Sequence, residues 1–442
     1  MKVSSAESSG DCYAWSSGIA TLSMETCNPV VSEIMRHAPR ILMLCNDRQI
    51  DRRILLQADS LEEDGWDVTI LAMPTDELAG MDDRRVRRIG ARTESAARQE
   101  NRVLGVYNVM RRHLPMNGRV MRTMKSLAWR FLVDHERFYL NLFLADARQH
   151  QAEVVVAHDL PMLAVGRTLS EEFGAHFVYD SHELYSEQEF SRGQRASWAQ
   201  VERRHIHACD QVITVNPSIA RELEARYGVA EVAVIHNAER IQAQTERSWY
   251  LHERFGIPRE HRVLLFQGGF SAGRNLLELV EAMALLPHCG IHLVLLGDGQ
   301  LAGALQRLVE RKGMSSRVHL HPAVAQSQLL KVTAAADAGV IPYQAICLNN
   351  YYCTPNKLFE FIAAGLPILA SDLPELRRLV EGNQIGCVGD LGTPRAIASM
   401  IEAFFSDGQR LQRWREQLAV VRQELSWQQE GERLKQLYKA FK

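Results

Sequence analysis

Short aliphatic runs alternate with longer segments of helical periodicity along the 442-residue chain, and this alternation begins near Arg40. The pattern is typical of βαβ units, in which helices connect the strands of a parallel sheet. We predict strands at 41–45, 68–72, 154–157, 177–180, 212–215, 232–236, 263–267, 291–296, 318–321, 338–341, 368–370 and 386–388. The chain is too long for one compact core, since single domains usually hold roughly 100–200 residues. We therefore predict an α/β protein with two doubly wound parallel sheets.

The strand pattern pauses between Asn237 and Arg262 and then restarts, which predicts a domain boundary in that interval. The first residues are rich in serine, lack periodicity and do not have the layout of a signal peptide. We predict a disordered extension at 1–39, a first domain at 40–240, a second domain at 241–425 and a C-terminal helix at 426–442. That helix either packs back across the first domain or is an ordinary terminal helix.

Composition excludes several classes of function. The formal net charge of −2 gives no reason to expect nucleic acid as a partner. The eight cysteines include no CxxC pair, which favours reduced thiols in an intracellular protein over disulfides or a zinc site. No apolar run approaches the roughly 18–20 residues of a membrane-spanning helix, so we expect a cytoplasmic protein that does not cross a bilayer.

One segment departs from this balance of charge. Between Asn101 and Val133 there are seven lysine and arginine side chains, all within 102–130, and no aspartate or glutamate. Apolar residues are interleaved with them, which is typical of a surface that binds an anionic membrane face or a lipid pyrophosphate. A solvated helix pair over the core explains the same pattern. The first alternative would attach the protein peripherally to the inner membrane face.

The segment 354–367 predicts a short helix with a phosphate site at its start. Thr354 suits the N-cap, Pro355 the first helical position and Gly365 the left-handed stop. Unpaired N–H groups and the helix dipole favour an anion there, and Asn356 and Lys357 lie in the same first turn. Glu360 would stand roughly 9 Å from the helix start, within reach of ribose hydroxyls. A surface Lys357–Glu360 pair is the alternative.

A second phosphate-binding candidate follows the strand predicted at 263–267. Gly268 and Gly269 allow backbone to approach a ligand, and Arg274 can donate two hydrogen bonds to phosphate oxygens. The spacing is not GxGxxG, which disfavours nicotinamide and flavin cofactors, and there is no Walker A motif. Gly297–Gly299 predicts a tight turn at the rim of the same pocket.

Polar residues also follow two predicted strands of the first domain. His158 and Asp159 follow one strand, and His182 and Glu183 follow the next. Because ligand sites in such sheets collect at the carboxyl ends of strands, these four residues predict one wall of a cleft. Their spacing fits no zinc pattern, and the absence of Asp-x-Asp also leads us to predict no metal.

Asp51 and Arg52 open a helix after the first predicted strand. Both could face the cleft, although the helix dipole alone also accounts for a carboxylate at Asp51.

With these motifs in hand, the chain resembles the GT-B glycosyltransferases, specifically the retaining enzymes of family 4, from about Arg40 to the C-terminus. The matching segments are AHDLP at 157–161, YDSHELYSE at 179–187, VIHNAE at 234–239, QGGFSAGRN at 267–275, LLGDGQL at 295–301 and TPNKLFEFIAAGLPILAS at 354–371. The resemblance implies two Rossmann-like domains that face a cleft. It also implies transfer of a sugar from a UDP- or GDP-sugar to a glycan, glycolipid or polysaccharide precursor, with retention and without a metal or other cofactor.

The resemblance assigns roles to individual residues. Glu360 resembles the second glutamate of the family's E-x7-E motif, which binds the donor ribose, and Arg274 resembles the basic ligand of the diphosphate. Gly268 and Gly269 match the turn of that loop, while Thr354, Asn356 and Lys357 would bracket the phosphates. His158 resembles the first-domain histidine near the transferred sugar. The catalytic set implied is therefore His158, Arg274 and Glu360, with Glu360 binding the donor rather than attacking it.

The chain departs from the family pattern at three places. Tyr352 stands where the first glutamate of E-x7-E would fall, so backbone groups or Asn349 and Asn350 would have to contact the donor sugar. Arg274 lacks the lysine that commonly accompanies it. The segment 46–52 replaces a glycine-rich loop, which bears on acceptor geometry.

Two other functions remain open at this point. A sugar-nucleotide epimerase or hydrolase of the same fold would convert the donor without an acceptor. A catalytically weak subunit would bind a sugar nucleotide, or a membrane partner through 101–133, and Tyr352 in place of a glutamate is consistent with it.

Overall fold

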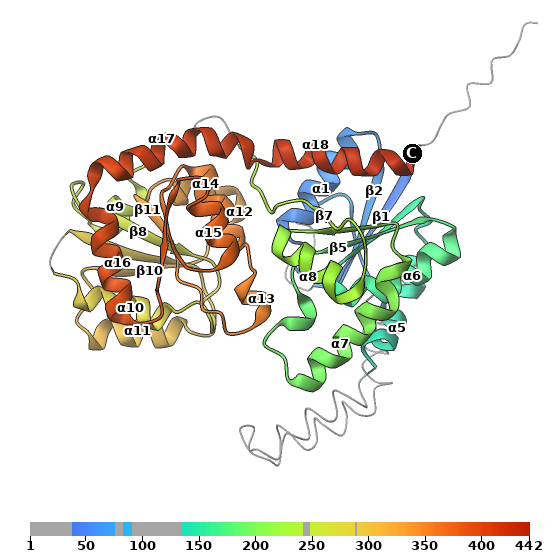
Figure 1. Ribbon diagram of the computed structural model, residues 1–442, viewed down its shortest axis with the longest axis horizontal. Coiled ribbons are helices and arrows are strands. Elements are labelled where there is room, and N and C mark those ends of the chain that lie inside the picture. Colours follow the sequence, from blue (N-terminus) through green and yellow to red (C-terminus); the bar gives the residue numbers. More distant parts are fainter. Residues whose placement is uncertain (1–37, 76–82, 91–133, 242–247, 288–289) are drawn as a thin grey trace, which may run out of the picture. The chain divides into compact units, whose positions relative to one another are not determined.

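The computed structural model describes residues 38–75, 83–90, 134–241, 248–287 and 290–442, which belong to one compact unit, Ala38–Lys442 (Figure 1). The basic segment 102–130 and residues 1–37 of the predicted extension lie outside the described residues. No helix in the described ranges has both the length and the apolar content needed to span a membrane.

The first domain contains a seven-stranded sheet in the order β3-β2-β1-β4-β5-β6-β7. Its strands are β1 Arg40–Cys45, β2 Asp67–Ala72, β3 Val86–Arg88, β4 Val154–His158, β5 His176–Ser181, β6 Gln211–Thr214 and β7 Ala233–Val234. All neighbouring pairs are parallel. Every residue of β4 is buried, as expected for a strand covered by helices on both faces.

Helices cover both faces of this sheet (Figure 1). They are α1 Arg52–Glu63, α5 His135–Ala147, α6 Leu160–Phe173, α7 Arg192–His205 and α8 Pro217–Tyr227, with 3₁₀ turns at Tyr185–Glu187 and Ile206–Ala208. Side chains of Asp51, Asp134, Ser191 and Asn216 cap four of the helices. Gly166 lets α6 approach the sheet, since a Cβ there would lie 2.5 Å from the Phe177 ring.

The second domain contains a six-stranded parallel sheet in the order β10-β9-β8-β11-β12-β13. Its strands are β8 Arg262–Gln267, β9 Ile291–Leu296, β10 Val318–His321, β11 Ala338–Ile341, β12 Ile368–Ser371 and β13 Gly386–Gly389. Its helices are α9 Tyr250–Phe255, α10 Leu276–Leu285, α11 Ala302–Arg311, α12 Gln326–Thr333, α13 Leu348–Tyr351, α14 Asn356–Ala364, α15 Pro374–Val380, α16 Pro394–Ser406 and α17 Gly408–Glu424. The predicted fold class of two doubly wound sheets is confirmed.

Two strands differ from the prediction. Strand β3 was not predicted, because it has only three residues and two of them are arginine. The segment 232–236 was predicted as a full strand, but only Ala233 and Val234 pair with β6, at the edge of the sheet.

The C-terminal helix α18, Trp427–Tyr438, packs against α1 (Figure 1). Trp427 donates a hydrogen bond from Nε1 to the Ser60 hydroxyl at 2.9 Å, and Leu434 and Tyr438 join an apolar cluster of the first sheet. A final 3₁₀ turn spans Lys439–Phe441. The last segment of the chain thus contributes to the core of the first domain.

In both sheets the strand order reverses at the centre, between β1 and β4 and between β8 and β11. The loops that follow these strands therefore lie where ligands bind in open α/β sheets.

Candidate functional site

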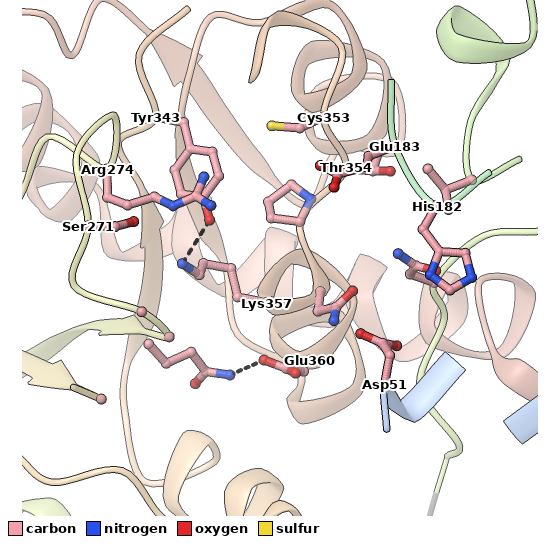
Figure 2. Close-up of a pocket in the computed structure, with 18 of the residues that line it drawn as sticks. Asp51, His182, Glu183, Ser271, Arg274, Tyr343, Cys353, Thr354, Lys357 and Glu360 are labelled. Carbon is pink, nitrogen blue, oxygen red and sulfur yellow. Dashed lines mark hydrogen bonds between the residues drawn. The ribbon is translucent and has the colours of Figure 1, made fainter. Parts of the chain in front are cut away.

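A cavity of about 760 Å³ is lined by residues from both domains (Figure 2). The first domain contributes the loops after β1, β4 and β5, and the second contributes the loops after β8, β9 and β11 together with the start of α14. Of the predicted site residues, the cavity wall includes Asp51, Asp159, His182, Glu183, Gly268, Gly269, Arg274, Thr354, Asn356, Lys357 and Glu360. His158 and Arg52 are not in that wall.

Helix α14 begins one residue later than predicted. Pro355, with φ −67° and ψ 147°, is the N-cap, and its carbonyl accepts a hydrogen bond from the Leu358 N–H. The prediction of Thr354 as N-cap is therefore wrong, because Thr354 precedes a proline and its hydroxyl accepts a hydrogen bond from Asn216 at 3.2 Å. No side chain caps the helix, so its first N–H groups remain available to a ligand in the cavity. The predicted stop at Gly365 is present, with φ 72°.

Lys357 lies beneath the glycine turn that follows β8. It is buried, and its Nζ donates a hydrogen bond to the Tyr343 hydroxyl at 3.1 Å. The same atom lies 3.9 Å from the centre of the Phe266 ring. A Cβ on Gly268, where φ is 116°, would come within 3.1 Å of this amine. Burial, reinforced by the nearby Arg274 guanidinium, holds the pKa of Lys357 well below its usual value.

Arg274 stacks on the ring of Tyr343, whose hydroxyl accepts the hydrogen bond from Lys357. Its guanidinium carbon lies 3.9 Å from the centre of the Tyr343 ring, and Figure 2 shows Arg274 and Lys357 gathered at that tyrosine. The loop is held by Asn275, whose side chain donates to the Leu391 carbonyl and accepts from Gln344. Arg274 and Lys357 therefore meet at Tyr343 although they come from separate segments of the chain.

Glu360 is buried on the next turn of α14 and does not pair with Lys357. Its Oε1 accepts a hydrogen bond from Arg52 at 2.9 Å, and its Oε2 accepts one from Gln267. Arg52 also pairs with Glu239, whose pKa is raised by burial despite the arginine. The alternative of a surface Lys357–Glu360 pair is wrong. Arg52 lies behind the predicted ribose ligand rather than in the cavity wall.

On the first-domain wall, His182 is held between two carboxylates. Its Nε2 lies 3.1 Å from Asp180 Oδ2, and its Nδ1 lies 3.4 Å from Asp159 Oδ2. Burial disfavours the charged ring, but the two carboxylates outweigh burial and raise the pKa of His182 to about 9. The ring is therefore an imidazolium near neutral pH, with Asp180 as its anionic partner and Asp159 on its other side.

His158 lies behind His182. Only 1% of His158 is exposed, and its Nδ1 is 3.1 Å from His182 Nε2. Burial lowers the pKa of His158, so this ring is neutral where His182 is charged. His182 lines the cavity and His158 does not, so the predicted role of His158 near the transferred sugar stays a prediction, in which His158 would act from behind His182.

Asp159 has a strained backbone, with φ 61° and ψ 163°. This conformation directs its carboxylate to the backbone N–H of His182 at 2.9 Å, and burial raises the pKa of Asp159 to about 7. This backbone conformation therefore links Asp159 to His182, and both residues line the cavity.

Asp180 was missed as a site residue. It is fully buried on β5 and accepts two hydrogen bonds from Arg53, at 2.9 and 2.8 Å. Arg53 and the two histidines overcome burial and hold the pKa of Asp180 well below its usual value. A charged residue inside an otherwise apolar strand was the available signal.

His158, Asp180 and His182 have ligand atoms within 4.8 Å of one another. This set differs from the His158, Asp159, His182 and Glu183 considered from the sequence. Arg53 and Gln57 already donate to Asp180, so a metal ion there would face a guanidinium. The donor set does not fit a metal ion.

Tyr352 stands where the family's first glutamate would fall, but its side chain is not among the residues that line the cavity. Its side chain packs against an apolar cluster of the first domain, whereas Asn349 and Asn350 line the cavity.

Two family models match the chain. The model described as Glycosyl transferase 4-like domain matches residues 50–238, and the model described as Glycosyl transferases group 1 matches residues 261–407. Together these matches take in most of both sheet domains. The chain belongs to the group 1 glycosyltransferases of GT-B fold.

Two curated relatives match part of this glycosyltransferase. A D-inositol 3-phosphate glycosyltransferase of Xylanimonas cellulosilytica is 28% identical over 36% of this chain and 38% of its own length. The lipopolysaccharide core biosynthesis glycosyltransferase LpsE of Rhizobium meliloti is 26% identical over 45% of this chain and 54% of its own length. The chain thus spans about half or less of these relatives.

Solved structures match nearly the whole glycosyltransferase and share its fold. Sucrose-phosphate synthase from Thermosynechococcus elongatus gives a TM-score of 0.68 at 17% identity, covering 91% of this chain and 98% of that one. Anabaena HepE in complex with UDP gives 0.66 at 16% identity, covering 91% and 100%. WaaG, a glycosyltransferase involved in lipopolysaccharide biosynthesis, gives 0.61 at 15% identity, covering 90% and 99%.

Proposed function

We propose that this glycosyltransferase transfers a hexosyl group from a nucleotide diphosphate sugar to a glycan, glycolipid or polysaccharide precursor, with retention and without a metal ion. The observation that carries the proposal is the meeting of Lys357 and Arg274 at Tyr343, beside the uncapped start of α14. Two cations and a row of N–H groups converge there on one cavity wall. That combination suits a diphosphate, which carries several negative charges over a few ångströms.

These groups would stabilise the leaving diphosphate. Negative charge grows on the bridging oxygen as the sugar departs, and donors already aimed at that oxygen lower the barrier more than mobile solvent does. A buried lysine is especially suited to this, because a diphosphate restores the charge that burial opposes. In this proposal the protein's own cations do the work that a divalent ion does in other transferases.

Glu360 would bind the donor ribose. Its carboxylate lies about one helical turn beyond the proposed phosphate site. Arg52 donates a hydrogen bond to one carboxylate oxygen, and Gln267 donates one to the other. Each oxygen still has accepting capacity for a ribose hydroxyl. Glu360 is a binding residue in this reaction, not a nucleophile.

The first-domain wall would hold the acceptor and the transferred sugar. Both ring N–H groups of His182 face carboxylates, so the imidazolium would act on an oxygen of the sugar through its positive charge rather than through a hydrogen bond. Departure and attack on the same face of the sugar would retain its configuration, as the family resemblance implies. The proposal also includes attachment to an anionic membrane face through residues 102–130. These residues lie outside the described ranges.

The solved complexes guide the choice of donor. Crystal structures of Anabaena HepE contain UDP, and another contains UDP-glucose. UDP and UDP-sugars are therefore the first ligands to test, followed by GDP-sugars.

The test uses Arg274→Ala and Glu360→Ala, with the exposed Arg307→Ala and Glu402→Ala as matched controls. We expect each site variant to keep its fold and to lose at least about tenfold in donor affinity or turnover, since each removes a charged hydrogen bond. Thermal stabilisation by UDP-sugars measures binding, because a ligand of the folded state raises Tm. Unchanged donor affinity and turnover in both site variants would refute the assignment, and turnover without acceptor would indicate a hydrolase or epimerase.

A further inference from the structure

Glu183 is a cavity carboxylate held by two neutral amides. It follows strand β5 and lines the cavity directly after His182 (Figure 2). Its Oε1 accepts a hydrogen bond from Gln188 Nε2, and its Oε2 accepts one from Asn349 Nδ2 at 2.5 Å. Both oxygens are thus fixed in direction, and each keeps a further lone pair for another donor.

Asn349 belongs to the other domain. It lies on α13, is 8% exposed, and accepts at Oδ1 a hydrogen bond from the Leu184 backbone N–H at 3.0 Å. One end of this amide therefore binds the first-domain backbone while the other end holds the Glu183 carboxylate. The orientation of Glu183 is consequently set by a side chain of the domain that carries the phosphate site.

The Glu183 carboxylate lines the cavity without a basic partner. Within the described ranges of the chain, no lysine, arginine or histidine forms an ion pair with it. Asp180 makes the contrast clear, because it is fully buried and saturated by Arg53, Gln57 and His182. A carboxylate that is fixed by amides and left without a cation is suited to accept hydrogen bonds from hydroxyl groups.

We propose that Glu183 accepts hydrogen bonds from hydroxyl groups of the transferred sugar, and that Asn349 is the positioning residue that aims it. The inference rests on the proposed function, since it assumes a nucleotide sugar in this cavity. We assign Glu183 to the donor sugar rather than to the acceptor because of Asn349. Asn349 belongs to the proposed donor-binding domain, so a carboxylate that it holds keeps a fixed position relative to the donor. Glu183 supplies the sugar carboxylate that Tyr352 does not provide.

The experiment separates the nucleotide from the sugar. UDP alone probes the phosphate and ribose sites. The sugar site is probed with the first donor that the wild type consumes among UDP-glucose, UDP-galactose and GDP-mannose. If that donor is GDP-mannose, GDP replaces UDP as the nucleotide probe. For Glu183→Gln we expect nucleotide affinity within about twofold of wild type and a fall of about 100-fold in kcat/KM for the donor. The exposed Glu189→Gln, six positions along the chain, is the matched control and should behave as wild type.

Asn349→Ala tests positioning. Alone it should lower donor kcat/KM by about tenfold at unchanged nucleotide affinity, and in the Glu183→Gln background it should add less than about twofold, because it acts through Glu183. A merely structural role would give additive losses and would weaken the nucleotide as well. If Glu183→Gln does not fold, Glu183→Asp keeps the charge but shortens its reach and should lower kcat/KM without changing nucleotide affinity.

The outcomes distinguish the two proposals. If the wild type binds UDP and consumes its sugar donor while Glu183→Gln or Glu183→Asp is unimpaired, this inference is overturned and the proposed function stands. Equal loss of nucleotide and donor binding in Glu183→Gln also overturns it. If the wild type binds no nucleotide diphosphate and consumes no donor, both are overturned.

Discussion

The two walls of the cavity differ in where they carry positive charge. The second-domain wall gathers Lys357, Arg274 and the N-terminus of α14 at one place, apart from the carboxylates of Asp298 and Glu360, whereas the first-domain wall has the carboxylates of Asp47, Asp51, Asp159 and Glu183 around His182. A cluster of cations suits a diphosphate, and a group of carboxylates suits the hydroxyl groups of sugars. In the proposed function each domain would therefore bind a different chemical part of the substrates.

The two walls also set their charge in opposite ways. On the second-domain wall burial lowers the pKa of Lys357, so the ligand-free site holds part of its positive charge back. On the first-domain wall Asp159 and Asp180 overcome burial and raise the pKa of His182 to about 9. The second-domain wall would therefore gain positive charge at Lys357 when an anion binds, whereas His182 on the first-domain wall is already charged before a ligand binds.

Removal of the buried amine should break the comparison most strongly. For Lys357→Met we expect UDP affinity to fall by about 100-fold or more, or about 2.7 kcal/mol, because the diphosphate loses a desolvated cation. Thermal stability in the absence of UDP should not decrease, since burying an ammonium is costly. Calorimetric titration measures the affinity, with the exposed Lys331→Met as control, and a UDP affinity within about threefold of wild type would contradict the role.

The same residue predicts a pH dependence with a definite sign. A diphosphate favours the ammonium and raises its pKa, so UDP binding takes up a proton between the lowered and the raised value, and affinity falls as pH rises through that window. In the ligand-free protein the unfolded chain binds more protons between the lowered pKa and about 10.5, so this group makes folding more favourable as pH rises there. Titrations in buffers of different ionisation enthalpy should detect the uptake, and Lys357→Met should abolish it.

His182→Asn tests the opposite wall, with a smaller expected effect. We expect kcat to fall by about 30-fold, or about 2 kcal/mol, at unchanged UDP affinity, because the positive charge beside the sugar is lost. The raised pKa means that wild-type activity should fall as pH rises through about 9. The stability that the imidazolium contributes is complete below its unfolded pKa of about 6.5 and is lost over the same rise.

The exposed His176→Asn is the control for this variant. An unchanged pH profile of kcat in His182→Asn would show that His182 is not the titrating group.

Arg52→Ala tests the contact that joins the walls and should have the smallest effect on ligands. Arg52 occupies one oxygen of Glu360 while pairing with Glu239, and its side chain is 13% exposed. We expect stability to fall by about 2 kcal/mol, because two mostly buried carboxylates lose their cation, and UDP affinity to change by less than about threefold. Chemical denaturation measures the first quantity, with the exposed Arg395→Ala as control; a large loss of UDP affinity would instead make Arg52 a ligand-binding residue.

Most of the fold follows from local patterns. Strands such as β4 and β9 are mostly aliphatic, with one histidine each, and burial on both faces favours that composition, so they were predictable. Strand β3 was not, because a short edge strand with two arginines needs no apolar pattern. Helix α14 was predicted from its proline and glycine, although its first residue was wrong by one position.

The donor wall was more predictable than the opposite wall. Gly268, Arg274, Lys357 and Glu360 lie in two contiguous motifs whose local patterns predict a phosphate site, and all four line the cavity. On the other wall, the choice between His158 and His182 depends on where two strand ends direct their side chains. That direction is set by the strained Asp159 backbone and by the Arg53–Asp180 pair; the position of Asp180 in a strand was a local signal, but its pairing with Arg53 and the Asp159 conformation had none.

The sequence by itself determined the two parallel sheets, the loops that carry most of the cavity residues and the position of those loops at the carboxyl ends of strands. These features depend on periodicity and turn chemistry over a few residues. Only the tertiary structure decided that Lys357 joins Arg274 at Tyr343, that Arg52 holds Glu360 and that Asn349 aims Glu183. Such pairs join residues far apart in the chain, and their hydrogen bonds require placement within a fraction of an ångström, which folding alone supplies.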